Sequence, residues 1–170
     1  RGLSEAEQSW LAQGAPGFNP PPPFGITAPP ALPIRAMAEW EELQALVVVW
    51  RLYKDILADI INAAKQECKV VVACSNIQTC KTELTSYGVD WSQNVDFIQA
   101  SSNSFWVRDY GGQPCYLNGV DSLAWVDWIY NRPRPLDDVM PELFGQYFNM
   151  PVYTTTVAPN DLVNTGGNFM

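Results

Sequence analysis

Residues 104–112 (Ser-Phe-Trp-Val-Arg-Asp-Tyr-Gly-Gly) place an aromatic ring, a cation and a carboxylate within four positions. The glycine pair after an apolar run indicates a tight turn, because glycine adopts backbone angles that other residues resist. A carboxylate there can bind a planar guanidinium by accepting two N–H groups at once, and Trp106 can add a cation–π contact. The alternative is an ordinary surface ion pair between Arg108 and Asp109 beside a core tryptophan.

A second candidate is the pair Arg132 and Arg134, separated by one proline, where residues 127–131 (Asp-Trp-Ile-Tyr-Asn) end a strand. In an extended X-Pro-X segment alternate side chains share one face, so these arginines can converge on one anion. A carboxylate held by paired guanidinium forks fits them best. The alternative is that they pair with Asp137 and Asp138, just downstream.

A third stretch, residues 164–170 (Asn-Thr-Gly-Gly-Asn-Phe-Met), ends the sequence. A Gly-Gly pair after a strand indicates that the backbone comes close to another segment. By itself this is a weak signal of function.

Composition narrows the class of protein. The chain has 170 residues, of which 47% are hydrophobic and 16% charged, as expected for a globular domain with a real core. A net charge of −8 argues against nucleic acid or an anionic membrane as a partner and suits a cationic substrate. No apolar run is long enough to predict a membrane span. The chain begins with Arg1 and shows no signal segment, so we expect it to be processed or trimmed.

Histidine is absent, so no mechanism within these residues uses a histidine base or a histidine-bound metal. The four cysteines, Cys68, Cys74, Cys80 and Cys115, lack CxxC spacing, and we predict no zinc or other metal site. Two disulfides are expected, with three pairings open, and buried thiols are the alternative. The even cysteine count, few lysines and many prolines favour a secreted, extracellular protein.

Hydrophobic periodicity predicts an α/β protein with mixed sheets. A helix is expected over 4–13, capped by Ser4 with Glu7 as its capping-box partner. The proline-rich residues 1–36 then form an N-terminal arm, either a loose tail or a segment packed on the main domain, 37–170. The expected strands are 46–50, 70–73, 95–99, 113–117, 122–126 and 152–157, with a hairpin turn at Asn118-Gly119, and the expected helices are 53–66, 77–87 and 141–149.

In this order the three stretches resemble the guanidino-modifying superfamily with the pentein fold, and within it the Porphyromonas-type peptidylarginine deiminases, which are related to agmatine deiminases. The resemblance runs from Met37 to the end of the sequence. It rests on residues 38–41 (Ala-Glu-Trp-Glu), 106–111, 130–135 (Tyr-Asn-Arg-Pro-Arg-Pro) and 165–170. The Arg-Pro-Arg segment is the most specific part, because agmatine has no carboxylate for it to bind.

The resemblance implies a five-bladed β/α propeller of ββαβ-like units, of which this chain covers roughly the N-terminal half. It also implies an enzyme, a hydrolase that converts peptidyl-arginine to peptidyl-citrulline and ammonia by covalent cysteine catalysis, without metal or cofactor. Asp109 matches a carboxylate that holds the guanidinium, and Trp106 lines the substrate channel. Arg132 and Arg134 match a clamp for the α-carboxylate of a C-terminal arginine, and Asn168 belongs to the substrate-binding segment.

The family's histidine, second carboxylate and nucleophilic cysteine lie beyond the segment that ends at Met170, and none of the four cysteines falls at the nucleophile's place. We expect a proteolytically processed enzyme whose second chain carries the remaining half. A degraded fragment and an inactive relative are the alternatives. The competing functions are deimination of agmatine or another small guanidine, and non-catalytic binding of arginine-containing peptides.

Overall fold

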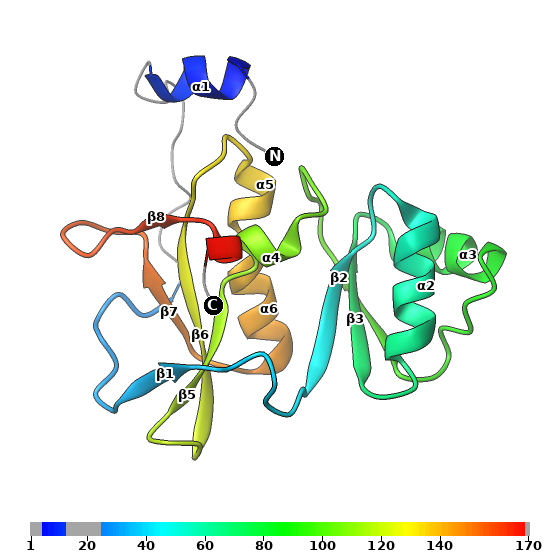
Figure 1. Cartoon of the computed structure of the whole chain (residues 1–170), viewed down its shortest axis with the longest axis horizontal. Coiled ribbons are helices and arrows are strands. Elements are labelled where there is room, and N and C mark those ends of the chain that lie inside the picture. Colours follow the sequence, from blue (N-terminus) through cyan, green and yellow to red (C-terminus); the bar gives the residue numbers. More distant parts are fainter. Residues whose placement is uncertain (1–4, 13–24, 169–170) are drawn as a thin grey trace.

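The computed structural model describes residues 5–12 and 25–168 of the chain, and its elements form two α/β layers side by side (Figure 1). In chain order the elements are α1 (Glu5–Ala12), β1 (Ile34–Ala36), β2 (Ala45–Val49), α2 (Lys54–Ala64), β3 (Lys69–Cys74), α3 (Ile77–Ser86), β4 (Val95–Gln99), α4 (Val107–Tyr110), β5 (Gln113–Leu117), β6 (Ser122–Tyr130), α5 (Pro135–Asp138), α6 (Met140–Phe148), β7 (Val152–Thr155), β8 (Val163–Asn164) and the 3₁₀ turn η1 (Gly166–Asn168).

The first layer is a three-stranded parallel sheet in the order β2-β3-β4, with α2 and α3 on one side of it (Figure 1). The central strand β3 is apolar along its length because both of its faces are covered. Val70 and Val72 pack with Ile61 of α2 and Leu84 of α3. Ala73, pointing the other way, packs against the second half of the molecule.

The second layer is a mixed sheet in the order β1-β5-β6-β7, with β8 also paired to β6. Strands β1, β5 and β6 run antiparallel, whereas β7 and β8 run parallel to β6. The β5–β6 hairpin turns at Asn118 and Gly119, both with positive φ, which confirms the predicted turn. Helix α6 covers the sheet by packing Phe144 against Trp125, with ring centroids 5.9 Å apart.

Residues 25–36 lie on this second sheet. Ile26 exchanges backbone hydrogen bonds with Val152 and Thr154, and residues 34–36 form β1 at the edge of the sheet. Helix α1 agrees with the helix predicted for residues 4–13, but Ser4, its expected cap, and the proline run 20–23 lie outside the described residues. None of the described helices is both long and apolar enough to cross a bilayer.

All four cysteines are free thiols, so the prediction of two disulfides is wrong for this structure. Cys115 lies on the second sheet, whereas Cys74 and Cys80 share the core beneath α2 and α3. Burial raises the pKa of Cys115 to about 11, so this thiol stays protonated and unreactive at neutral pH. The predicted secretion rested partly on disulfides and loses that support.

Candidate functional site

The Trp-Val-Arg-Asp-Tyr stretch forms a single helical turn, α4, held firmly in place. Tyr110 is 1% exposed and its hydroxyl donates to the backbone oxygen of Ser104 at 3.0 Å. The backbone N–H of Gly111 donates to Val107 at 2.7 Å and closes the turn. With Tyr110 fixed in the core, Asp109 is left partly exposed on the rim of the turn.

The glycine pair after α4 is the tight turn that the sequence predicted. Gly112 has a φ of 76°, and a Cβ on it would lie 2.5 Å from Nε1 of Trp125. That indole N–H donates to the backbone oxygen of Gly111 at 2.7 Å. The pair therefore lets α4 approach strand β6 more closely than any side chain would allow.

The second glycine pair, in η1, is packed directly against α4. A Cβ on Gly166 would lie 2.2 Å from the backbone oxygen of Arg108, and one on Gly167 would lie 2.8 Å from Oδ1 of Asp109. The close approach expected from the third stretch is thus confirmed, and its partner is the Asp109 turn. Asn168 ends η1, but the placement of its side chain lies outside what the structure describes.

The two arginines approach the same region through Tyr130, the last residue of β6. Nη1 of Arg134 donates to the Tyr130 hydroxyl at 3.4 Å. Burial raises the pKa of Tyr130, the positive charges of Arg134 and Arg132 oppose that rise, and the negative charge of Asp109 adds to it. Arg134 is thus the arginine in direct contact with Tyr130, and the charges of Asp109 and Arg132 also influence the pKa of that phenol.

Helix α5 ties these segments together through two buried carboxylates. Asp137 accepts the backbone N–H groups of Asn103 and Ser104, at 2.6 and 3.0 Å, and the Ser104 hydroxyl at 2.6 Å. Asp138 accepts the backbone N–H of Tyr130 at 2.6 Å. Burial raises the pKa of Asp137, and the charge of Arg134 is among the influences that oppose it. The two aspartates thus anchor the backbone on either side of the candidate site.

The alternative for the first stretch placed Trp106 in the core, and that part of it is wrong. Arg108 forms an exposed ion pair with Glu39, with Nη2 and Oε1 2.6 Å apart. Trp106 is 47% exposed instead of buried, and its ring lies 4.3 Å from that of Phe105. Phe105 in turn packs edge-on against Tyr53. Trp106 is therefore available to contact a ligand.

Two contributors were not assigned a role from sequence: Glu39, which holds Arg108, and Tyr130, which meets Arg134. Both residues belong to the short motifs that carry the family resemblance, so membership of those motifs was the signal that could have indicated a role for them. Among the described residues, no group of three or more cysteine, aspartate or glutamate side chains is placed to hold a metal ion.

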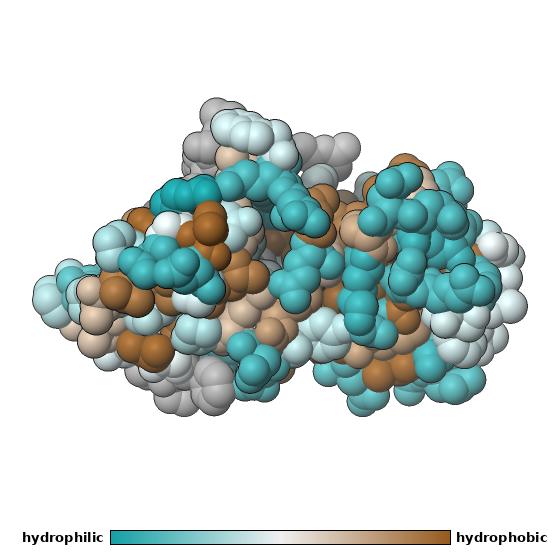
Figure 2. Space-filling view, turned by 90° about the horizontal axis from the view of Figure 1, so that it is seen from below, coloured by the Kyte–Doolittle hydropathy of each residue, from teal (hydrophilic) through white to brown (hydrophobic). Residues whose placement is uncertain are grey.

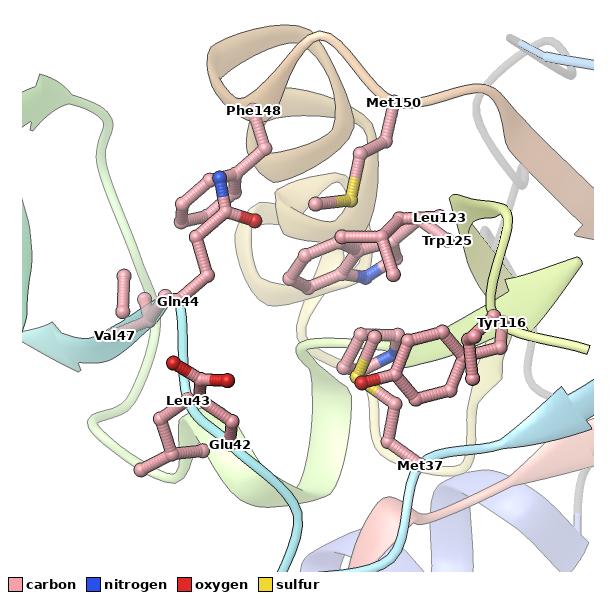
Figure 3. Close-up of a pocket in the computed structure, with 13 residues that line it drawn as sticks. Met37, Glu42, Leu43, Gln44, Val47, Tyr116, Leu123, Trp125, Phe148 and Met150 are labelled. Atoms are coloured by element: carbon pink, nitrogen blue, oxygen red, sulfur yellow. The ribbon is translucent and has the colours of Figure 1, made fainter.

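A cavity of about 470 Å³ lies elsewhere, between the segment leading into β2 and the second sheet (Figure 3). Its walls are mostly apolar, formed by residues such as Trp125, Phe148 and Met150, with Glu42 as its one carboxylate. Asp109 does not line it.

On the surface seen from below, hydrophobic residues are interspersed with polar ones (Figure 2).

Comparison with solved structures finds the same fold in guanidino-group deiminases. An agmatine deiminase from C. jejuni matches with a TM-score of 0.60 and 20% identity, over 79% of this chain and 41% of that one. A provisionally assigned peptidyl-arginine deiminase matches with a TM-score of 0.62 and 22% identity, over 79% and 42%. A provisionally assigned arginine deiminase from Porphyromonas gingivalis gives 0.62 and 16%, over 79% and 43%.

No family model matches the sequence. The structural matches agree with the resemblance carried by the sequence motifs, and at these identities they show a shared fold. The chain spans about two fifths of the length of these neighbours. It therefore shares the α/β fold of part of these agmatine and peptidyl-arginine deiminase structures.

Proposed function

We propose that this chain forms part of the active site of a guanidino-group deiminase, and that the substrate is peptidyl-arginine, preferentially at a peptide's C-terminus. The observation that carries the proposal is that Asp109 lies against Gly167 while Arg134 contacts Tyr130, whose pKa the charge of Asp109 raises and the charges of Arg134 and Arg132 lower. A site with an anionic end and a cationic end complements arginine, which has a guanidinium at one end and a carboxylate at the other.

Each residue then has a role. Asp109 accepts the guanidinium N–H groups, and Trp106 forms a wall of the channel through its exposed ring. Arg132 and Arg134 bind the α-carboxylate. A cysteine thiolate attacks the guanidinium carbon, ammonia leaves, and water releases the citrulline. The thiolate and a histidine come from the part of the fold beyond Met170, which we expect on a second chain.

The alternative substrate is agmatine, which the C. jejuni neighbour's name supports as directly as the other neighbours support arginine. Agmatine lacks a carboxylate, so the arginine pair cannot bind it in this way. Replacing both arginines separates the two substrates. With the protein that carries the complete site, Arg132→Gln/Arg134→Gln should raise KM for a peptide ending in arginine about 100-fold, since two charge-assisted contacts are lost.

The same double variant should leave agmatine turnover within about twofold of the parent, because no contact to that substrate is removed. The matched control is Arg35→Gln/Lys69→Gln, which removes two cations from exposed ion pairs with Glu41 and Asp96. If the Arg132/Arg134 double variant lost activity equally on both substrates, or if the control variant lost as much activity as the double variant, the clamp would be overturned.

Two further proposals accompany this one. One is that a second chain carries the rest of the site. Mass spectrometry of the purified protein tests this, and we expect it to find a second polypeptide that contains cysteine and histidine. Finding only the folded 19.0 kDa chain would instead favour a non-catalytic module that binds arginine-containing peptides. The second is secretion, which the cell fraction in which the protein accumulates would test.

A further inference from the structure

A polar cavity of about 400 Å³ lies where the three parallel strands end. Arg51 follows β2, Ser75 follows β3 and Ser102 follows β4, and all three line it. The carboxyl edge of a parallel sheet is where α/β proteins bind their ligands. Neither Asp109 nor the Arg132/Arg134 pair lines this cavity, so it is separate from the candidate site above.

The charge in the cavity is positive. Nη1 of Arg51 donates to the backbone oxygen of Ser102 at 2.5 Å, which holds the guanidinium at the sheet edge. Within the described chain its remaining N–H groups have no other partner. Lys54 also lines the cavity, but Glu83 binds its Nζ at 2.7 Å and offsets that charge. Asp55, the acid in the first turn of α2, is exposed and does not line the cavity.

The nearly buried Ser102 also lines the cavity. Ser102 is 7% exposed, and among the described residues its hydroxyl forms no hydrogen bond. A hydroxyl that lines a cavity and has no partner among the described residues can donate to a ligand or to solvent. This observation is independent of the charge of Arg51.

The start of α2 adds unsatisfied donors. The helix begins at Lys54, and the residue before it, Tyr53, has a φ of 54° and gives no side-chain cap. Its first-turn N–H groups therefore have no side-chain acceptor from the cap residue, and Lys54 is the first-turn residue that lines the cavity. By contrast, α3 is capped by Asn76, whose side chain accepts the backbone N–H of Thr79 at 2.8 Å.

We propose that this cavity binds a phosphate group, either free or as a monoester. The Arg51 guanidinium, the Ser102 hydroxyl and the backbone N–H of Lys54 at the start of α2 would supply the donors, which suits an oxyanion. The proposal does not depend on deiminase activity.

Titration of the chain with inorganic phosphate, followed by isothermal calorimetry, tests it directly. We expect saturable binding that Arg51→Gln weakens about tenfold or more, because a charge-assisted contact is lost. The matched control is Lys69→Gln, which removes one cation at the opposite end of β3 and should leave binding unchanged.

Because Arg51 also holds the backbone of Ser102, a second variant is needed. Ser102→Ala breaks no hydrogen bond of the protein and should keep the same circular dichroism while weakening phosphate binding several-fold. Tighter binding of phenyl phosphate than of inorganic phosphate would identify an esterified group as the ligand, and equal or weaker binding a free one. No saturable response, or equal losses in Lys69→Gln and Arg51→Gln, would overturn the proposal.

Discussion

Asp109 is the residue on which recognition of the guanidinium depends in this account. It lies on the rim of α4, against the backbone of Gly167. In Asp109→Asn the carboxylate can no longer accept two N–H groups from the substrate cation, so we expect affinity for a peptide ending in arginine to fall about 100-fold. Calorimetric titration measures the change.

The control for this variant is Asp121→Asn, which makes the same change of charge in the exposed hairpin between β5 and β6. It should bind the peptide as the parent does. Equal binding by the parent and Asp109→Asn would show that another group holds the guanidinium.

Tyr130 is predicted to position Arg134 rather than to contact the substrate. Its buried hydroxyl accepts from Nη1 of Arg134 at 3.4 Å. Tyr130→Phe removes that acceptor and keeps the ring that packs on Tyr110. We expect about threefold to tenfold weaker binding of peptides ending in arginine, the equivalent of one modest hydrogen bond.

Agmatine distinguishes this role from a purely structural one. Its binding should not change in Tyr130→Phe, because no carboxylate is held by Arg134. A variant that loses affinity for both ligands to the same extent would show that Tyr130 supports the whole site instead.

At the scale of elements, the site depends on η1 fitting against α4 without a side chain between them. In Gly167→Ala the new Cβ would lie 2.8 Å from Oδ1 of Asp109, so the carboxylate must move. We expect a loss of peptide affinity of at least tenfold, with the free energy of unfolding lowered by no more than about 1 kcal/mol. Urea unfolding and titration of the same samples measure both.

Gly119→Ala serves as the opposite control. Gly119 has a φ of 79° but open space around it, so alanine costs about 1 kcal/mol of stability through backbone strain and touches nothing. Its peptide affinity should be unchanged. If the two variants behave alike, the η1–α4 contact has no special part in binding.

Long elements with strong patterns could be predicted from the sequence, and short ones could not. The strand predicted over 95–99 matches β4, and the helices predicted over 77–87 and 141–149 match α3 and α6 within a residue or so. Strand β6 continues to Tyr130, beyond the predicted end at residue 126. Strands β1 and β8 have three and two residues, too few to show a period.

For the candidate site, too, some residues could be predicted from the sequence and others could not. Residue types and spacing indicated Asp109, Trp106 and the two arginines, because each motif is local in sequence. The contacts of Glu39 with Arg108 and of Tyr130 with Arg134 depend on how distant segments meet or on side-chain direction, which spacing does not encode. The cysteines are also free thiols, and their even number in the sequence does not encode whether they are paired.

For the molecule as a whole, Asp127 makes stability depend on pH. It is 2% exposed, and its Oδ1 has no hydrogen-bond partner among the described residues. Burial, aided by the negative charges of Asp138 and Glu142, raises its pKa to about 8. The unfolded chain has the ordinary aspartate pKa of about 4, so the folded state binds the proton more tightly between these values.

Because the folded pKa is the higher one, stability from this group is fully present below pH ~4 and is lost as pH rises toward ~8. We expect Tm to fall between pH 5 and pH 8 in the parent and to fall less in Asp127→Asn, whose amide does not ionise. Thermal melts across that range measure this. An identical decline in both proteins would show that Asp127 is not the group responsible.

The most direct test of the central claim is citrulline formation by the intact preparation, with mass spectrometry of every polypeptide in it. Three substrates are compared: a peptide ending in arginine, a peptide with internal arginine, and agmatine. We predict turnover chiefly of the first, with a second polypeptide present that carries the cysteine and histidine. Turnover of agmatine alone would contradict the Arg132/Arg134 clamp, and no turnover by a folded 19.0 kDa chain on its own would contradict the proposed enzyme.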